Sequence, residues 1–348
     1  MPLMMDESRI PPRWAEQRNG NHLAAKTSSK TLSGLLSLAL INNMPDAAIE
    51  DTETQFFDLL GSAAGDLPVH IELYSLPHIP RGERGLQHLS NFYSGIDGLL
   101  NRHFDGVIMT GTEPRQSNLR EEPYWPALAE VLDWAESNTS STVLSCLAAH
   151  AGVLHSDGIS RNPLPDKQFG VFSYEKIHDH ALTKSAPDII HIPHSRWNEV
   201  RAQDLESCGY TLLTKSLGAG VDLFVKEKKK SLFVHFQGHP EYGTRTLLKE
   251  YRRDIRRFLA KERETYPTMP FAYFNATAAQ LLNEFQQQAL AGGQEDLMAT
   301  FPDTIVGESL QPVWQPNAAS IYRNWLQYLA SRKTNTRSPG SLAWAGRG

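Results

Sequence analysis

The sequence predicts an α/β fold: a mostly parallel sheet covered by helices on both faces. Short apolar runs typical of buried strands recur along the chain, and segments with a helical spacing of apolar residues separate them. Polar, cysteine or glycine residues follow several of these runs, where ligands of parallel sheets bind. The predicted strands are Leu35–Ile41, Val69–Leu76, Asp105–Gly111, Ser141–Ser145 and Ser231–Phe236.

Four segments carry the apolar spacing of amphipathic helices. In Trp125–Ser137, for example, Leu128, Val131 and Leu132 fall on one face. Because helices alternate with strands, the sheet is expected to be mostly parallel. The predicted helices are Ile49–Leu60, Trp125–Ser137, Leu147–His155 and a terminal docking helix at Ala319–Leu329.

Composition divides the chain into four parts. Residues 1–34 are polar and rich in Ser, Lys, Arg and Asn, which predicts a loose arm or a partner-binding extension. Residues 35–265 carry the α/β pattern. Residues 266–333 form a C-terminal extension that ends in the docking helix, with a loop-rich stretch at 286–318. Residues 334–348 are polar and glycine-rich and are expected to be disordered.

The overall composition excludes several classes of protein. The chain has 348 residues, 40% of them apolar, which is enough for a substantial core. The net charge of −5 predicts neither nucleic-acid nor anionic-membrane binding. Apolar runs stay well below the ~20 residues that cross a bilayer. Since the N-terminus has no apolar signal region and there are only two cysteines, a cytoplasmic protein without disulfides or a metal site is expected.

Cys146 lies where the predicted strand Ser141–Ser145 meets the helix that begins at Leu147. A sharp turn there lifts the thiol out of the sheet and brings it near the unbonded N–H groups of the helix start. The positive end of the helix favours the thiolate. Free cysteine is also often just a small buried apolar residue, so the local context alone leaves both interpretations open.

His239 is a candidate general base for Cys146. It follows a strand and Gly238, and Pro240 keeps it off a helix, while Glu241 is close enough to orient its ring. The imidazole could then take a proton from a nucleophile and return it to a leaving group. A histidine in an ordinary turn is the alternative, but two such motifs in one chain favour catalysis.

Motifs around these residues carry a family resemblance, which runs from about Leu38 to Asp254. They are Asn43-Met44-Pro45, Thr52-Glu53-Thr54-Gln55, Phe104–Gly111, Tyr124-Trp125, Ser141-Thr142, Gly170-Val171-Phe172, Pro193-His194-Ser195-Arg196 and Gly238–Tyr242. In their order and spacing they resemble the homoserine O-succinyltransferase and homoserine O-acetyltransferase family, which has a class I glutamine amidotransferase-like (flavodoxin-like) fold.

The resemblance implies a cysteine acyltransferase that works by a ping-pong mechanism in methionine biosynthesis. Succinyl-CoA or acetyl-CoA would be a substrate, the hydroxyl of homoserine the acceptor, and no bound cofactor or metal would be needed. A homodimer is compatible with the family. The implied catalytic residues are Cys146, His239 and Glu241, and the implied contacts to the amino-acid substrate are Lys167, Ser195 and Arg253.

Two departures from the family pattern concern the surroundings of the nucleophile. The family has a lysine associated with the oxyanion site after Met-Pro, whereas here the longer, acidic segment 46–51 follows. Backbone N–H groups, such as that of Leu147, would then hold the oxyanion. His150 stands where the family usually has an amide, and it is either a packed helix residue or an additional proton relay.

A third departure is Arg115, which falls on the position that discriminates acyl groups in the family. A cation there would complement the free carboxylate of a succinyl group and offer nothing to acetyl, so succinyl is the favoured donor. Arg115 could instead point to solvent, and Glu113 could neutralise it.

Three alternatives to a homoserine acyltransferase remain open from the sequence. Serine is one methylene shorter than homoserine, and such a difference separates substrates by only ~1–3 kcal/mol. A glutamine amidohydrolase would use the same kind of Cys-His-Glu set. A non-catalytic relative that only binds a metabolite or a partner is the third alternative, which the absent lysine supports.

Overall fold

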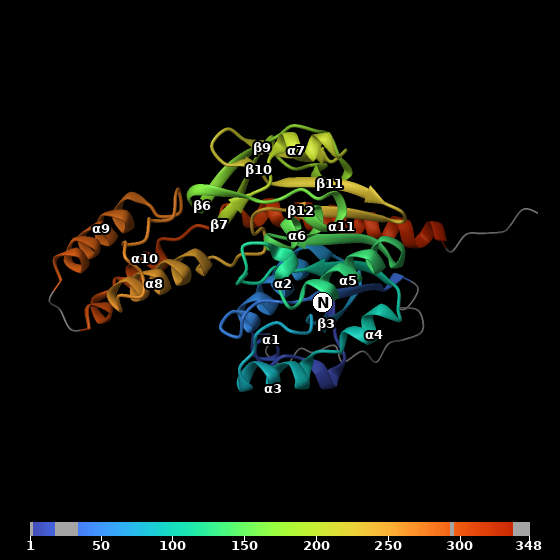
Figure 1. Ribbon diagram of the computed structural model, residues 1–348, viewed down its shortest axis with the longest axis horizontal. Coiled ribbons are helices and arrows are strands. Elements are labelled where there is room, and N and C mark those ends of the chain that lie inside the picture. Colours follow the sequence, from blue (N-terminus) through green and yellow to red (C-terminus); the bar gives the residue numbers. More distant parts are fainter. Residues whose placement is uncertain (1–2, 18–33, 293–295, 337–348) are drawn as a thin grey trace, which may run out of the picture.

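The computed structural model describes residues 3–17, 34–292 and 296–336, and it confirms the α/β class (Figure 1). Within these ranges the larger sheet has eight strands, of which the first six in spatial order are parallel, the seventh runs antiparallel to them and the eighth antiparallel to the seventh. In that order they are β1 (Leu3–Met4), β3 (Val69–Tyr74), β2 (Leu36–Ile41), β4 (Phe104–Met109), β5 (Thr139–Ser145), β12 (Ser231–Phe236), β11 (Leu223–Lys228) and β8 (Thr211–Leu212).

Helices cover both faces of this sheet, as the sequence predicts. Leu38 and Leu40 of β2 share one apolar cluster with residues of α2 and α11, whereas Ile41 belongs to a second cluster with residues of α5 and α6. The covering helices are α2 (Ile49–Ala64) and α11 (Gln315–Thr336) on one face, and α5 (Trp125–Asn138) and α6 (Leu147–Asp157) on the other. The shorter helices of this part are α1 (Pro12–Gln17), α3 (Glu83–Phe92), α4 (Ile96–Leu100) and α7 (Ala202–Ser207).

A second, antiparallel sheet shares an apolar cluster with β12 of the large sheet and was not predicted from the sequence. Its order is β10 (Gly220–Val221), β9 (Thr214–Ser216), β6 (Asn162–Lys176) and β7 (Ile189–Glu199). Pro163 and Pro165 interrupt the alternation in β6, and its register shifts between Pro163 and Gln168. Prolines and bulges hide the period-2 signal by which a strand is recognised.

The start of the chain is folded onto the large sheet, so the prediction of a loose arm is wrong for residues 3–17. β1 pairs with β3 and extends the sheet by one strand. Leu3, Met5 and Trp14 are buried, and the Trp14 ring lies 5.0 Å from that of Phe57 on α2. These few apolar side chains bury enough surface to fix a segment whose average composition is polar. Residues 18–33 of the predicted arm lie outside the described part of the chain.

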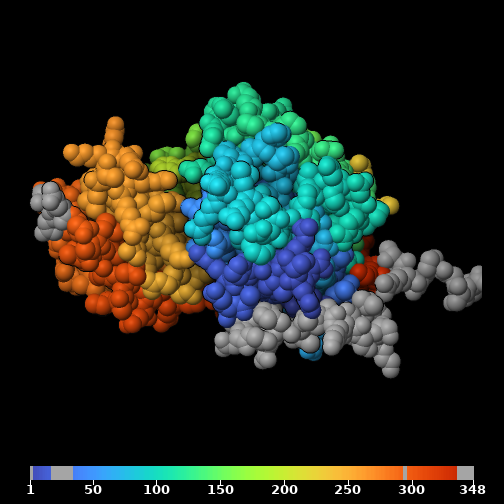
Figure 2. Space-filling model, turned by 90° about the horizontal axis from the view of Figure 1, so that it is seen from below, coloured from blue at the N-terminus to red at the C-terminus, as the bar shows by residue number. Residues whose placement is uncertain are grey.

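The segment after β12 forms a helical lobe at one end of the molecule (Figures 1 and 2). It contains α8 (Thr246–Leu259), α9 (Ala276–Ala291) and α10 (Asp303–Glu308), which share one apolar cluster across the predicted boundary at residue 265. That division of the chain stays a prediction. Much of the stretch expected to be loop-rich is helical, and the docking helix at 319–329 is part of α11. None of the helices in the described ranges is long and apolar enough to cross a membrane.

Candidate active site

Cys146 occupies a sharp turn between β5 and α6, as the sequence predicts. Its backbone has φ 53° and ψ −112°, a conformation that residues other than glycine rarely adopt. The turn is held by hydrogen bonds from Cys146 N to Phe236 O (2.8 Å) and from Ala149 N to Cys146 O (3.0 Å). A strained strand-to-helix turn that presents one side chain is the usual support of a nucleophile in α/β enzymes.

His239 and Glu241 join Cys146 at the carboxyl edge of the sheet, where β12 lies beside β5. The Nδ1 atom of His239 lies 2.9 Å from Oε1 of Glu241, which also accepts a hydrogen bond from Ser145 Oγ at 3.2 Å. Because the carboxylate accepts, Nδ1 carries the proton and Nε2 is left for the thiol. The structure thus brings the three predicted catalytic residues together.

The environment of His239 favours its charged form. Burial lowers the pKa of His239, but the charges of Cys146 and Glu241 and their hydrogen bonds raise the pKa well above its usual value. The ring also stacks on Tyr242, with 4.2 Å between centroids. A cationic imidazole beside a thiolate is the arrangement that activates a cysteine nucleophile.

The three predicted contacts to the amino-acid substrate meet at two carboxylates of α8 that the sequence did not reveal. Lys167 Nζ lies 3.5 Å from both Glu250 and Asp254. Arg253 lies 2.9 Å from Asp254, and the Ser195 hydroxyl donates to Glu250. Groups of both charge signs match the α-ammonium and α-carboxylate of an amino acid. The spacing of Glu250 and Asp254 on one helix face was the signal that could have identified them.

Tyr242 connects this cluster to the catalytic histidine. Its ring stacks on His239, while its hydroxyl donates to Glu250 Oε1 at 2.7 Å. The residues predicted to bind the acceptor are therefore adjacent to the histidine that was predicted to take the proton of its hydroxyl.

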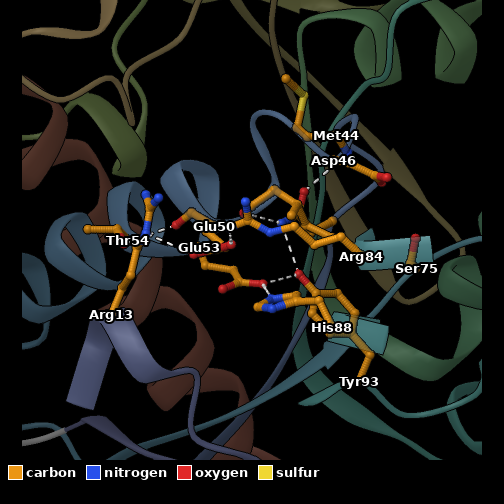
Figure 3. Close-up of polar contacts among 12 residues, drawn as sticks. Arg13, Met44, Asp46, Glu50, Glu53, Thr54, Ser75, Arg84, His88 and Tyr93 are labelled. Carbon is orange, nitrogen blue, oxygen red and sulfur yellow. Dashed lines mark hydrogen bonds and ion pairs between the residues drawn. The ribbon is translucent and has the colours of Figure 1, made fainter. Parts of the chain in front are cut away.

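The acidic segment 46–51, which stands where the family has a lysine, is held by contacts with neighbouring parts of the chain (Figure 3). Arg81 is almost fully buried, donates to the Met44 carbonyl and pairs with Asp46 Oδ1 at 3.2 Å. Asp46 Oδ2 accepts from Gly82 N at 2.8 Å, so the aspartate has a structural function. Backbone N–H groups at the start of α6 remain the expected donors to an oxyanion.

The same region holds a buried acidic residue of the 52–55 motif. Glu53 Oε1 accepts from the Tyr93 hydroxyl at 2.6 Å and lies 2.7 Å from His88 Nε2, and Figure 3 shows these three side chains facing one another. Asn42 Nδ2 donates to the Tyr93 hydroxyl at 3.0 Å. This network joins α2 and α3 to the end of β2. The 52–55 motif is therefore explained by its contribution to the stability of the fold.

His150 is a packed helix residue in this structure. Its Nε2 lies 2.9 Å from Oε1 of Gln237, whose amide nitrogen donates to Val200 O and Val221 O. The Gln237 oxygen must therefore accept, and Nε2 of His150 carries a proton. Burial, with the Arg196 charge next in size, lowers the pKa of His150 to about 3. With this pKa the His150 ring is neutral at neutral pH. We therefore interpret His150 as a packing residue and not as a proton relay.

Arg115 lies on the surface in the loop between β4 and α5. Its backbone N–H and that of Gln116 donate to Glu122 Oε1, so the loop is held through its main chain. Among the described residues no ion pair joins Arg115 to Glu113. The neutralisation considered for this pair is therefore absent, and the specificity role of Arg115 stays a prediction.

A buried polar network lies directly behind His239. Asp222 Oδ1 accepts from Gly238 N at 2.7 Å and lies 3.5 Å from His194 Nε2. Arg196 Nε donates to His194 Nδ1 at 3.1 Å, which fixes the proton of His194 on Nε2. A Cβ on Gly238 would come within 2.7 Å of the His194 ring, so only glycine fits there. The network sets the backbone that carries His239.

We expect Asp222→Asn to become more stable relative to the wild type as pH rises from about 4 to 7. Burial raises the pKa of Asp222 to about 7, against the Gly238 hydrogen bond and the Arg196 charge. Between about pH 4 and 7 Asp222 binds more protons in the folded state than in the unfolded state, so its contribution to the free energy of unfolding falls as pH rises. Urea unfolding across this range should show a free energy of unfolding that rises more, or falls less, with pH for the variant than for the wild type. The exposed Asp188→Asn serves as control, and an identical slope in all three proteins would contradict the expectation.

Known proteins resemble this chain over most of its length. A family model described as "HTS: Homoserine O-succinyltransferase" matches residues 11–336. A homoserine O-succinyltransferase of Rhodopseudomonas palustris is 40% identical over 92% of this chain and 96% of its own, and one of Methylorubrum extorquens is 43% identical over 85% and 88%.

Solved structures are more distant. A glutamine amidotransferase of Thermotoga maritima is 12% identical with a TM-score of 0.45, covering 85% of this chain and 98% of its own. A glutamine amidotransferase of Methylobacillus flagellatus is 11% identical with a TM-score of 0.42, covering 90% and 99%. The family match over most of the chain decides the assignment: this chain belongs to the homoserine O-succinyltransferase family.

Proposed function

We propose that the protein transfers a succinyl group from succinyl-CoA to the hydroxyl of homoserine through an acyl-enzyme on Cys146. The observation that carries this proposal is the contact between His239 and Cys146, which lies in the strained turn. Glu241 orients His239, with 2.9 Å between its Oε1 and the Nδ1 atom of the ring. Membership of the homoserine O-succinyltransferase family supports the donor and the acceptor. The product, an O-acyl amino acid, would feed methionine biosynthesis.

In the first half-reaction the Cys146 thiolate attacks the thioester carbonyl of the acyl-CoA. The negative oxygen of the tetrahedral intermediate is held by N–H groups at the start of α6. The bond to the CoA sulfur then breaks, and the His239 imidazolium gives its Nε2 proton to the leaving thiolate. Cys146 is left as a thioester and His239 as a neutral ring.

In the second half-reaction homoserine binds beside Tyr242, against the cluster formed by Lys167, Ser195, Arg253 and the acids of α8. Arg253 grips the α-carboxylate, because a guanidinium forms two parallel hydrogen bonds with it. Glu250 or Asp254 accepts from the α-ammonium. Nε2 of His239 takes the hydroxyl proton as the oxygen attacks the acyl carbon, and the Cys146 thiolate leaves.

We expect Cys146→Ala to abolish the covalent intermediate. Wild-type protein incubated with succinyl-CoA without acceptor should gain the mass of one succinyl group, because the ping-pong mechanism stops at the acyl-enzyme. Intact-mass spectrometry checks this, and adding homoserine should discharge the adduct. Cys208→Ala is the matched control, since Cys208 is the other free cysteine and should not affect acylation. Succinylation of the Cys146→Ala protein at the same rate would refute the assignment of the nucleophile.

A further inference from the structure

Arg161 is a half-buried cation that clamps the loop between β4 and α5. It lies just before β6, and its guanidinium donates to the carbonyl oxygens of Gln116 (3.3 Å) and Ser117 (3.2 Å). Both hydrogen bonds are long for a charged donor. The clamped loop is the one that carries Arg115, so the two arginines border the same segment.

This loop begins against the nucleophile turn. A Cβ on Gly111 would come within 2.6 Å of the Leu147 Cβ, so the two backbones touch at the residue after Cys146. At its other end the buried Glu122 carboxylate holds the N–H groups of Arg115 and Gln116. The loop therefore runs from the nucleophile turn to Arg161, which holds it at the Gln116 and Ser117 carbonyls.

The charge of Arg161 has no carboxylate partner within ion-pair distance among the described residues. Burial lowers the pKa of Arg161, while the charges of Tyr124, Glu122 and Cys146 act in the opposite direction. Glu122 lies close enough to act on Arg161 by its charge but forms no ion pair with it, and its Oε1 accepts from two backbone N–H groups. A partly desolvated, unpaired guanidinium near a nucleophile is a ready site for an anionic group of a ligand.

We propose that Arg161 binds the free carboxylate of the succinyl group while its thioester carbonyl is at Cys146. This inference rests on the proposed function, since it names a contact of the same donor. Arg161 has two advantages over Arg115: it is half-buried, so water screens its charge less, and it is fixed by the loop carbonyls. Arg115 is exposed, so its charge attracts the carboxylate without forming fixed hydrogen bonds to it.

The test compares succinyl-CoA with butyryl-CoA, which has an acyl chain of the same length without the carboxylate. Single-turnover acylation of Cys146 is followed by intact mass for the wild type, Arg161→Gln, Arg161→Lys and Arg115→Ala. In Arg161→Gln the rate constant with succinyl-CoA should fall by about 10- to 100-fold relative to that with butyryl-CoA, because a charged hydrogen bond is lost. Arg161→Lys should retain part of the preference, and Arg115→Ala should lose only a few-fold.

The ratio between the two donors separates binding of the carboxylate from other functions of Arg161. Equal losses with both donors would show that Arg161 acts on the loop or the thiolate, and they would overturn the inference. A preference for succinyl-CoA that is lost in Arg115→Ala but kept in Arg161→Gln would overturn it as well. If Arg161→Gln fails to fold, Arg161→Lys, which keeps the charge but not the fork, gives the same comparison. Absence of any adduct on folded wild type would instead remove the proposed function.

Discussion

His239→Ala should lower kcat/KM for acyl transfer by roughly 10²- to 10⁴-fold, which is the range of a general acid–base residue. The loss should affect both half-reactions, because in the proposed mechanism His239 protonates the departing CoA sulfur and deprotonates the acceptor hydroxyl. It also removes the cation beside Cys146. Steady-state kinetics with succinyl-CoA and homoserine measure the effect. The exposed His178→Ala is the control and should leave the rate unchanged.

Glu241→Gln refines this expectation, since it keeps the shape of the side chain but removes its charge. The Glu241 charge and hydrogen bond are among the factors that raise the pKa of His239, so this pKa should fall in the variant. An NMR titration of the ring reports that shift independently of the rate. A kcat/KM for His239→Ala within a few-fold of the wild type would exclude His239 as the proton carrier.

Gly170→Ala should lower the free energy of unfolding by roughly 3 kcal/mol or more, at the upper end of single substitutions. Gly170 has φ 139°, and a Cβ there would come within 2.3 Å of both N and O of Phe271. These are main-chain atoms, which cannot turn aside as a side chain can. Phe271 N donates to Phe169 O at 2.9 Å, and Val171 N donates to Phe271 O at 2.8 Å. The substitution would break this junction between β6 and the helical lobe.

Chemical denaturation of the purified variant measures the loss. Gly98→Ala is the matched control: Gly98 is exposed in α4, its φ is ordinary and no atom lies near its Cβ position. Alanine in a helix should be neutral or slightly stabilising there. Equal stability of the two variants would mean that the 169–171 segment adapts to a side chain without cost.

The central strands could be predicted because each is a short apolar run with a clear end. β12 was predicted with its observed bounds, and β2, β4 and β5 to within two residues at either end. Cys146 and His239 could be found for the same reason, since both follow a strand that local sequence reveals. The proximity of Cys146 and His239 follows from the pairing of two parallel strands. Because the carboxyl ends of parallel strands meet at one edge of a sheet, the predicted strands were enough to place both residues there.

The residues that the sequence missed owe their positions to distant contacts. Asp222 is 28 positions from His194, and nothing local marks either as part of a pair (222 − 194 = 28). Arg161 was missed because the loop to which it donates hydrogen bonds lies more than forty residues earlier in the sequence. Trp14 was overlooked because a single buried aromatic in a polar segment leaves the average composition unchanged. Such contacts are decided by tertiary packing, which propensity and pattern do not contain.

The position of α11 at the end of the chain has a consequence for biosynthesis. Its Trp325 indole donates to Ser141 Oγ on β5 at 2.9 Å, and a Cβ on Gly106 of β4 would come within 2.8 Å of the same ring. A ribosome adds about 5–20 residues per second, starting from the N-terminus. Cys146, His239 and Glu241 are thus all synthesised before the helix that covers their sheet. A nascent chain that stalls before residue 315 carries all three predicted catalytic residues on a sheet with one apolar face only partly covered, and such a chain would need chaperones to protect it from aggregation.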